Sequence, residues 1–312
     1  MRLLKIVPDD IAIPFMRFRK LFMMISTAAV VLSLAMVFVK GMNFGIDFQG
    51  GILVEVRMPQ AANLGQMRGQ LGSLGLGEVS LQEFGHPSDV LIRIAAQEGD
   101  ASAQQAAVTA VKDALGTGVD YRRVEFVGPK VSSELLLDGV LAVGMAIMAM
   151  LIYIWLRFEW QFGLGAVAAL THDVFLTLGI FSLLGLEFNL STVAAVLTIA
   201  GYSINDTVVV FDRIREDLRK FKTKPIPELL NGSINATLSR TLMTSITTLV
   251  ALLALFFLGG EVIRDFSFAM IFGVLVGTYS SICVASPLLL YTNVAARARS
   301  GGDASEEAAE TP

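Results

Sequence analysis

The sequence contains few of the residues from which enzymes build metal or nucleotide sites. It has one cysteine, Cys283, and two histidines in 312 residues. A single cysteine excludes an internal disulfide, and two histidines leave little for a zinc site. Neither a Gly-Lys dipeptide, required for a Walker A loop, nor a His-Glu-x-x-His sequence occurs. We therefore expect no enzymatic activity, no metal and no cofactor, and an energy source other than a nucleotide bound by that loop.

Charged residues are also scarce, at 17% of the chain compared with about a quarter in an average soluble protein. The net charge of −4 provides no basic excess, so nucleic acid is not an expected partner. Hydrophobic residues make up 54% of the chain, and its mean hydropathy is +0.64. This is too much apolar surface for a monomer that faces water on all sides, and it indicates a protein that contacts membrane lipid.

Six charge-poor stretches are long enough to cross about 30 Å of hydrocarbon, which takes roughly 20 apolar residues in a helix. The first is too long for a cleaved signal peptide and has no Ala-x-Ala site, so we expect it to remain as an anchor. Pro287 should kink or end the last helix. The predicted membrane helices are 21–40, 136–156, 162–185, 188–211, 241–260 and 266–290.

Lysine and arginine are concentrated in two segments outside these helices. Arg17, Arg19 and Lys20 directly precede the first helix, and six follow the fourth. The positive-inside rule places such segments in the cytoplasm, and six spans put both termini on the same side. We therefore predict a cytoplasmic N-terminus (1–20), a cytoplasmic loop (212–239) and a disordered, acidic cytoplasmic tail (297–312).

One large polar insert, residues 41–133, separates the first two membrane helices and is predicted to lie outside. Its hydrophobic pattern follows the order βαββαβ, which is that of a ferredoxin-like α+β domain. The expected elements are a strand at 52–58, a helix at 61–74, strands at 78–84 and 89–95, a helix at 101–115 and a strand at 119–127. The predicted fold is an α-helical membrane protein of six transmembrane helices with one outer ferredoxin-like domain.

A few ionisable residues fall inside the predicted membrane helices, where a charge costs about 2.5 to 3.5 kcal/mol. Asp173, next to His172, lies near the middle of the third helix, and Asp206 lies in the inner third of the fourth. Arg240 begins the fifth helix. His172 and Asp173 are either members of a proton path or a packed, hydrogen-bonded pair.

Helical spacing connects Asp206 and Arg240 to polar neighbours. Polar or small residues recur along one face of each helix, so the two faces should pack together with Asp206 opposite Arg240. Small movements of such a pair could change whether the carboxylate holds a proton, although a static ion pair that binds two helices is the alternative. The expected faces are Ser191 or Thr192, Ala195, Thr198, Tyr202 and Asp206 in the fourth helix, and Arg240, Thr244, Thr247 and Thr248 in the fifth.

Residues 201–216, GYSINDTVVVFDRIRE, closely resemble the smaller subunits of the SecD/SecF family of bacterial protein-export membrane proteins. Other matching segments are Gly45 to Gly51, Val127 to Pro129, Arg157 to Trp160, His172 to Val174, Ser233 to Asn235 and Ser239 to Thr241. The similarity runs from the first to the sixth membrane helix. The chain departs from the pattern at Ala236, where glutamine is frequent, and at Ser132-Ser133, where glycine is common.

The resemblance implies a half-transporter of the resistance-nodulation-division superfamily with SecD as its partner, in the bacterial inner membrane. It also implies use of the proton motive force to draw preproteins through the SecYEG channel, with Asp206 and Arg240 in the proton path. Gly45, Gly50, Gly51, Gly128 and Pro129 link the outer domain to the first two membrane helices and are candidate coupling hinges.

Two other functions remain open at this point. A small-molecule exporter of the same superfamily would share the membrane helices, but the compact outer insert leaves no obvious room for a drug pocket. An intramembrane aspartyl protease would use Asp173 and Asp206, but the Gly-x-Gly-Asp motif of such proteases is absent, since Asn205 precedes Asp206.

Overall fold

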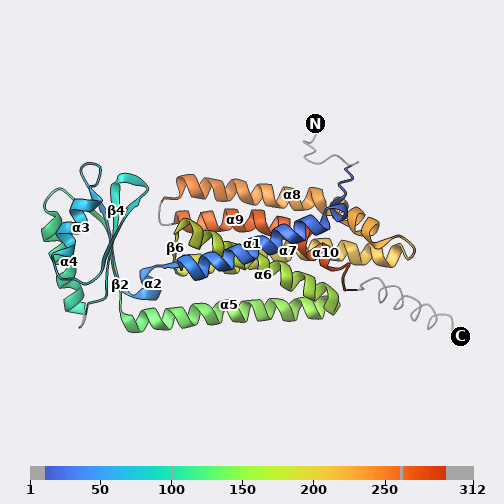
Figure 1. Cartoon of the computed structure of the whole chain (residues 1–312), viewed down its shortest axis with the longest axis horizontal. Coiled ribbons are helices and arrows are strands. Elements are labelled where there is room, and N and C mark those ends of the chain that lie inside the picture. The colour runs from blue at the N-terminus through green and yellow to red at the C-terminus, as the bar shows by residue number, and fades with distance from the viewer. Residues whose placement is uncertain (1–10, 98, 100, 261–262, 293–312) are drawn as a thin grey trace. The chain divides into compact units, whose positions relative to one another are not determined.

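The computed structural model describes residues 11–97, 99, 101–260 and 263–292. The chain divides into two compact units (Figure 1). The first, the helical bundle, comprises Met1–Met42, Val143–Leu186 and Ser191–Pro312, and the second, the ferredoxin-like domain, comprises Asn43–Ala142 and Glu187–Leu190. The predicted tail at 297–312 lies outside the described residues, as do the first ten residues of the predicted N-terminal segment.

Among the described residues, six helices are long and apolar enough to cross a membrane. They confirm the predicted fold class. They are α1 (Arg19–Lys40), α5 (Pro129–Arg157), α6 (Trp160–Leu184), α7 (Leu190–Lys220), α8 (Ile226–Leu258) and α9 (Arg264–Ser280), the last of which continues as a helix to Leu288. A short 3-10 turn, η1 (Phe15–Arg17), precedes α1.

Helices α7 and α8 extend well beyond the predicted membrane helices. The segment 212–239, which we expected to be a loop, is helical except for residues 221–225. The reason is a second hydrophobic face: Ile214 and Leu218 in α7, and Leu230, Ile234 and Leu238 in α8, recur at intervals of four and are buried in the core of the helical bundle. Most charge in this segment therefore lies on the outer faces of the helices, with the buried Asp217 as an exception that accepts hydrogen bonds from Arg213 and Ser233.

The last membrane helix changes its winding before Pro287. Residues Ser281–Ala285 form a π-helical turn, labelled η3, and only α10 (Ser286–Leu288) follows. Proline cannot donate the backbone hydrogen bond and its ring crowds the carbonyl four residues earlier, so a wider turn relieves the clash. The expected effect of Pro287 is thus present, and Ser286 Oγ satisfies the carbonyl of Ser281 at 2.8 Å.

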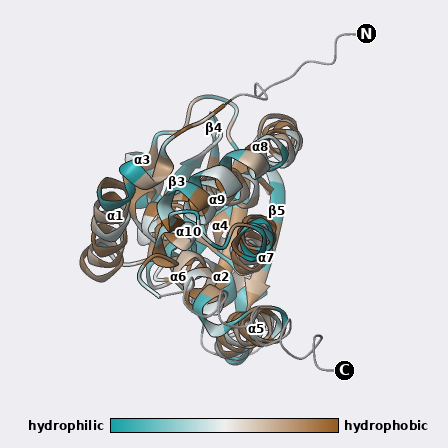
Figure 2. Cartoon of the chain, turned by 90° about the vertical axis from the view of Figure 1, so that its right-hand side faces the viewer, coloured by the Kyte–Doolittle hydropathy of each residue, from teal (hydrophilic) through white to brown (hydrophobic). Residues whose placement is uncertain are grey.

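The membrane helices differ in how much of their surface the chain itself covers. More than half of the apolar stretch is buried in α7 and in α9, but only a small fraction in α1 and α5. Figure 2 shows α1 and α5 coloured mainly as hydrophobic. Large apolar side chains such as Phe38 and Leu156 are almost fully exposed, as expected for helices that contact lipid.

The ferredoxin-like domain has the predicted βαββαβ order, with bounds shifted by up to three residues. Its sheet has the strand order β3-β4-β2-β5, with every neighbour antiparallel, and its core lies between the sheet and α3 and α4. Asn63 caps α3 by accepting a hydrogen bond from Gln66 N at 3.1 Å. The elements are β2 (Gly51–Arg57), α3 (Leu64–Gly72), β3 (Val79–Phe84), β4 (His86–Ile94), α4 (Ala101–Leu115) and β5 (Asp120–Val127).

A cross-strand ion pair closes one end of this sheet. Arg57 in β2 lies opposite Asp89 in β4 and donates two hydrogen bonds of 2.6 Å to its carboxylate. These hydrogen bonds hold the pKa of the Asp89 carboxyl below its usual range. The pair is structural, because both partners are already satisfied by each other.

The segment that follows α1 is more ordered than a hinge. β1 (Asn43–Phe44) pairs in parallel with β6 (Glu187–Phe188), a two-stranded sheet that the sequence did not predict, and Gly45 N donates to Phe188 O at 2.9 Å. The short helix α2 (Ile46–Gln49) comes next. The chain leaves the four-stranded sheet through Gly128 and Pro129, where the proline occupies the first turn of α5.

Gly51 is required by close packing as well as by backbone conformation. Its backbone φ of +120° is one that residues other than glycine rarely adopt. A Cβ at this position would also collide with the carbonyl oxygen of Ile94 on β4. We expect Gly51→Ala to destabilise the ferredoxin-like domain by about 1 to 3 kcal/mol. Faster hydrogen exchange of the β2 and β4 amides in the full chain would measure it. Gly69→Ala, at a helical position with nothing within 4 Å, is the control that should leave exchange unchanged.

Candidate functional site

A buried hydrogen-bond network surrounds Asp173, which has no exposed surface. Its Oδ2 accepts hydrogen bonds from Ser203 Oγ in α7 at 2.5 Å and from Ser280 Oγ in α9 at 2.7 Å. Its Oδ1 lies 2.8 Å from His172 Nδ1 on the same helix, α6. One carboxylate therefore joins three membrane helices. This geometry fits the packed alternative for Asp173, since each of its oxygens already has a partner.

A second chain of hydroxyl groups connects α7, α8 and α9. Tyr202 in α7 donates to Ser245 Oγ in α8 at 3.3 Å, and Ser245 Oγ lies 2.7 Å from Thr278 Oγ1 in α9. Gly277, next to Thr278, allows the approach, because a Cβ there would lie 3.2 Å from Ser203 Cβ in α7. The small residues Gly273 and Gly277 thus pack against α7, where a Cβ at Gly273 would collide with Ile199.

The polar faces of α7 and α8 differ in part from the predicted ones. Thr198 and Thr247 are exposed on the surface of this chain, while Ser203, Thr241 and Ser245 are buried. Thr247 and Thr198 need no partner from another helix, since each donates to a backbone carbonyl four residues earlier. The buried polar face of α8 is thus shifted by one residue from the predicted face.

Asp206 is buried in α7, with 2% of its surface exposed, and its Oδ2 has no hydrogen-bond partner among the residues that the structure describes. Arg240 is near enough to act on it electrostatically, but within the described ranges the two form no ion pair. Instead, Arg240 is exposed and lines a cavity at the end of the bundle where α5, α7 and α8 meet. The facing arrangement predicted for Asp206 and Arg240 is therefore looser than a contact pair.

Several other buried polar atoms in the bundle have no hydrogen-bond partner in the described part of the chain. They include His172 Nε2 in α6 and Thr241 Oγ1 in α8, in addition to Asp206 Oδ2 in α7. Buried polar atoms are nearly always satisfied by protein or by ordered water, so each such atom is a candidate water contact. These three atoms lie on three different membrane helices.

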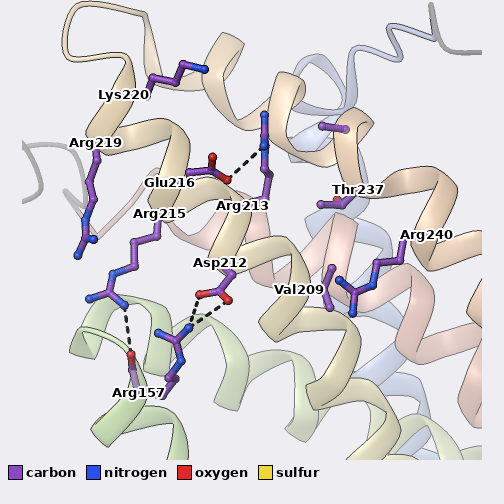
Figure 3. A pocket seen from close by; sticks show the side chains of 11 residues that line it. Arg157, Val209, Asp212, Arg213, Arg215, Glu216, Arg219, Lys220, Thr237 and Arg240 are labelled. Atoms are coloured by element: carbon purple, nitrogen blue, oxygen red, sulfur yellow. Dashed lines mark hydrogen bonds and ion pairs between the residues drawn. The ribbon is translucent and has the colours of Figure 1, made fainter.

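A large basic cavity, which we call the basic pocket, adjoins this region (Figure 3). Its volume is about 950 Å³, and it opens between the last turn of α5, the charged end of α7 and the first half of α8. Six cationic and two acidic side chains line it. The lining residues are Arg157, Val209, Asp212, Arg213, Arg215, Glu216, Arg219, Lys220, Ala236, Thr237 and Arg240.

Sequence reasoning missed Ser203, Ser245 and Ser280, which make the interhelical contacts of the polar networks. A signal was present for Ser203, because it lies three residues before Asp206 and so shares its helical face. Serine is common in membrane helices, where it often bonds only to its own backbone, so its residue type alone does not mark a network.

Comparison with known proteins places the chain in a family. Residues 107–295 match the C-terminal family model of the protein export membrane proteins SecD/SecF, and residues 35–62 match the SecD/SecF GG motif. The protein translocase subunit SecF of Rickettsia rickettsii is 48% identical over 290 residues, which cover 92% of this chain and 94% of that protein. SecF of Rickettsia prowazekii is 46% identical over 288 residues, with coverage of 92% and 93%.

Solved structures agree with this placement. The crystal structure of SecDF, a translocon-associated membrane protein from Thermus thermophilus, matches with a TM-score of 0.83 and 38% identity over 91% of this chain. A second crystal structure, of SecDF in a super-membrane-facing form, matches with a TM-score of 0.68 and 36% identity over 96% of this chain. This chain spans only 39% and 41% of those two solved chains. The chain belongs to the SecD/SecF family, as a member of its SecF group of protein translocase subunits.

Proposed function

We propose that this Sec translocase subunit acts with SecD to use the proton motive force for late steps of preprotein movement through the SecYEG channel. The observation that carries the proposal is Asp206, a buried carboxyl group within a membrane helix whose Oδ2 has no hydrogen-bond partner in the ranges that the structure describes. Such a group is costly in a membrane unless it binds or releases something. A proton is the simplest ligand for it.

In this mechanism protons enter from outside, reach Asp206 through hydrated polar groups and leave inward past Arg240. The unpartnered His172 Nε2 and Thr241 Oγ1 support water-filled steps on this route. Asp173 acts by holding α6, α7 and α9 together, because its oxygens are taken by Ser203, Ser280 and His172. One charge crossing about 100 mV releases about 2.3 kcal/mol, enough to bias a conformational equilibrium about 50-fold.

Movement of the membrane helices would reach the four-stranded sheet of the ferredoxin-like domain through two covalent connections. Gly45, Gly50 and Gly51 follow α1, and Gly128 and Pro129 lead into α5. Because Gly45 and Gly51 are closely packed, we expect the first connection to transmit motion as a rigid element more than as a flexible hinge. Both termini are proposed to lie in the cytoplasm of a bacterium, with the domain outside its inner membrane.

The exporter and protease alternatives receive no comparable support. The relatives are translocase subunits, and no hydrogen bond joins Asp173 to Asp206 in the described part of the chain. A protease that uses two aspartates needs them to share one site.

The experiment is preprotein export into vesicles that contain the complex with SecD, driven by a proton gradient or by a sodium gradient alone. We expect the proton gradient to stimulate export with the wild-type chain and to have no effect with Asp206→Asn. Asp138→Asn, a change at an exposed aspartate of α5, is the matched control and should retain stimulation. Undiminished proton-driven export with Asp206→Asn would refute the role of Asp206 in the proton path. Stimulation of export by the sodium gradient alone would refute the proton as the coupling ion.

A further inference from the structure

The basic pocket contains more positive charge than its own carboxylates neutralise. Asp212 accepts hydrogen bonds from Arg157 at 2.8 and 3.1 Å, and Arg213 pairs with Glu216 at 3.2 Å, as drawn in Figure 3. Arg213 also contacts Asp217 at 3.2 Å. The carboxylates near the pocket are therefore occupied by two of its six cations.

The other four cations of the pocket have no carboxylate partner within the ranges that the structure describes. They are Arg215, Arg219, Lys220 and Arg240. Arg215 is held against α5 by a 3.4 Å hydrogen bond from Nη1 to Arg157 O, and its buried Nε has no acceptor. Like charges gathered around one cavity repel each other, and a buried guanidinium donor without an acceptor is costly. An anion in the cavity would offset the repulsion between these cations.

The position of the pocket along the membrane helices identifies the source of that anion. The two tryptophans of the chain, Trp155 and Trp160, flank Arg157 in sequence and are 73% and 52% exposed. Exposed tryptophan is enriched where lipid headgroups meet hydrocarbon. Leu156, between Trp155 and Arg157, is 85% exposed and offers apolar surface to an acyl chain. The pocket thus lies at the depth of the headgroups, beside a surface that lipid covers.

We propose that the basic pocket binds the phosphate of an anionic phospholipid headgroup. Arginine side chains bind phosphate oxygens with paired hydrogen bonds, and basic cavities between membrane helices on the cytoplasmic side suit such headgroups. A cavity of about 950 Å³ has room for a glycerol phosphate together with water. Arg215 and Arg219 of α7 are the main phosphate contacts, and the lipid tails lie along α5.

The two tryptophans provide a direct probe, because bromine on a lipid quenches nearby tryptophan fluorescence. The full chain is reconstituted in phosphatidylcholine vesicles with increasing fractions of brominated phosphatidylglycerol, and a parallel series uses brominated phosphatidylcholine. We expect quenching to saturate at a low fraction of the anionic lipid and not with the zwitterionic one. Each basic group near a membrane surface increases the affinity for anionic lipid about five-fold. The double variant Arg215→Gln with Arg219→Gln should therefore weaken binding of phosphatidylglycerol about 30-fold.

Two variants separate this site from general attraction to a charged surface. Arg17→Gln with Lys20→Gln removes the same charge near α1, outside the pocket, and should leave quenching unchanged. Arg219→Gln alone removes an exposed side chain that makes no hydrogen bond or ion pair with the other described residues. It therefore reports on the site even if the double variant folds poorly. Equal losses in the pocket and control variants would overturn the proposal.

Other anions are tested in the same system. Soluble glycerol phosphate is the first alternative. If it binds as tightly as the lipid vesicles, and brominated phosphatidylglycerol causes no extra quenching, the pocket is a site for a free phosphate and the lipid proposal is refuted. The second alternative is an acidic peptide with the sequence of residues 303–312. If this peptide binds more tightly than anionic vesicles do, the pocket is a peptide site and the lipid proposal is also refuted.

Discussion

Gly179→Leu is expected to separate α1 from α6. A Cβ at position 179 would collide with the side chain of Ser33 in α1 and would lie 2.8 Å from the Ser33 Cα atom. The backbone at Ser33 cannot move aside without shifting the whole helix, so the clash has no local relief. The same interface contains Ser182, whose Oγ donates to Met36 O at 3.0 Å and Gly41 O at 2.7 Å. A displaced α1 would leave these groups unpaired.

The expected loss of stability lies at or above the upper end of the range of about 1 to 3 kcal/mol typical of overpacked sites. Unfolding of the purified chain in detergent, followed by circular dichroism and by protection from trypsin, measures it. Gly144→Leu is a matched control, because it makes the same change in α5 at a position with nothing within 4 Å. Equal stability of the two variants would show that α1 and α6 do not pack as closely as described.

Asp173→Leu is the second substitution for which we expect a large effect. It removes the acceptor for Ser203 and Ser280 and the partner of His172 Nδ1 in a site without exposed surface. At about 0.6 kcal/mol for an average membrane hydrogen bond, three lost bonds cost about 2 kcal/mol. The buried donors left without an acceptor raise the loss of stability to about 5 kcal/mol. The loss is smaller if the Ser280 hydroxyl donates instead to Gly277 O, which is 3.2 Å away.

Two further variants separate the hydrogen bonds from the charge. Ser203→Ala removes one bond and should cost less than half as much as Asp173→Leu. Asp173→Asn keeps an acceptor and the shape of the side chain, so it should be the mildest change at this position. Unfolding in detergent gives the order of stability. If Asp173→Leu were as stable as the wild type, the network would not hold α6, α7 and α9 together.

Local patterns were sufficient for the membrane helices and the ferredoxin-like domain. The six charge-poor stretches and the βαββαβ order follow from periodicity and length, which depend on neighbouring residues alone. The same reasoning ended α7 too early and began α8 too late. It took the charges of segment 212–239 as a sign of a loop, although Ile234 and Leu238 continue a buried apolar face.

The candidate site shows where sequence reasoning stops. Asp173 and Asp206 could be selected from sequence, because a carboxylate in an apolar helix is costly wherever it points. Their surroundings could not, since Ser203 lies 30 residues and Ser280 lies 107 residues from Asp173 along the chain. Which face of α8 is buried also depends on the neighbouring helices. Threonine residues do not mark the buried face, because a threonine on any face can donate a hydrogen bond to a carbonyl of its own helix.

By itself, then, the sequence determined that this is a six-helix membrane protein of the SecD/SecF family that carries a ferredoxin-like domain and a few buried charges. Only the tertiary structure decided that Asp173 is fully hydrogen-bonded while Asp206 retains an unpartnered oxygen, and that cations from α5, α7 and α8 surround one cavity. The physical reason is that helix formation and membrane insertion depend on local composition, whereas hydrogen-bond partners and charge clusters depend on which helix faces meet.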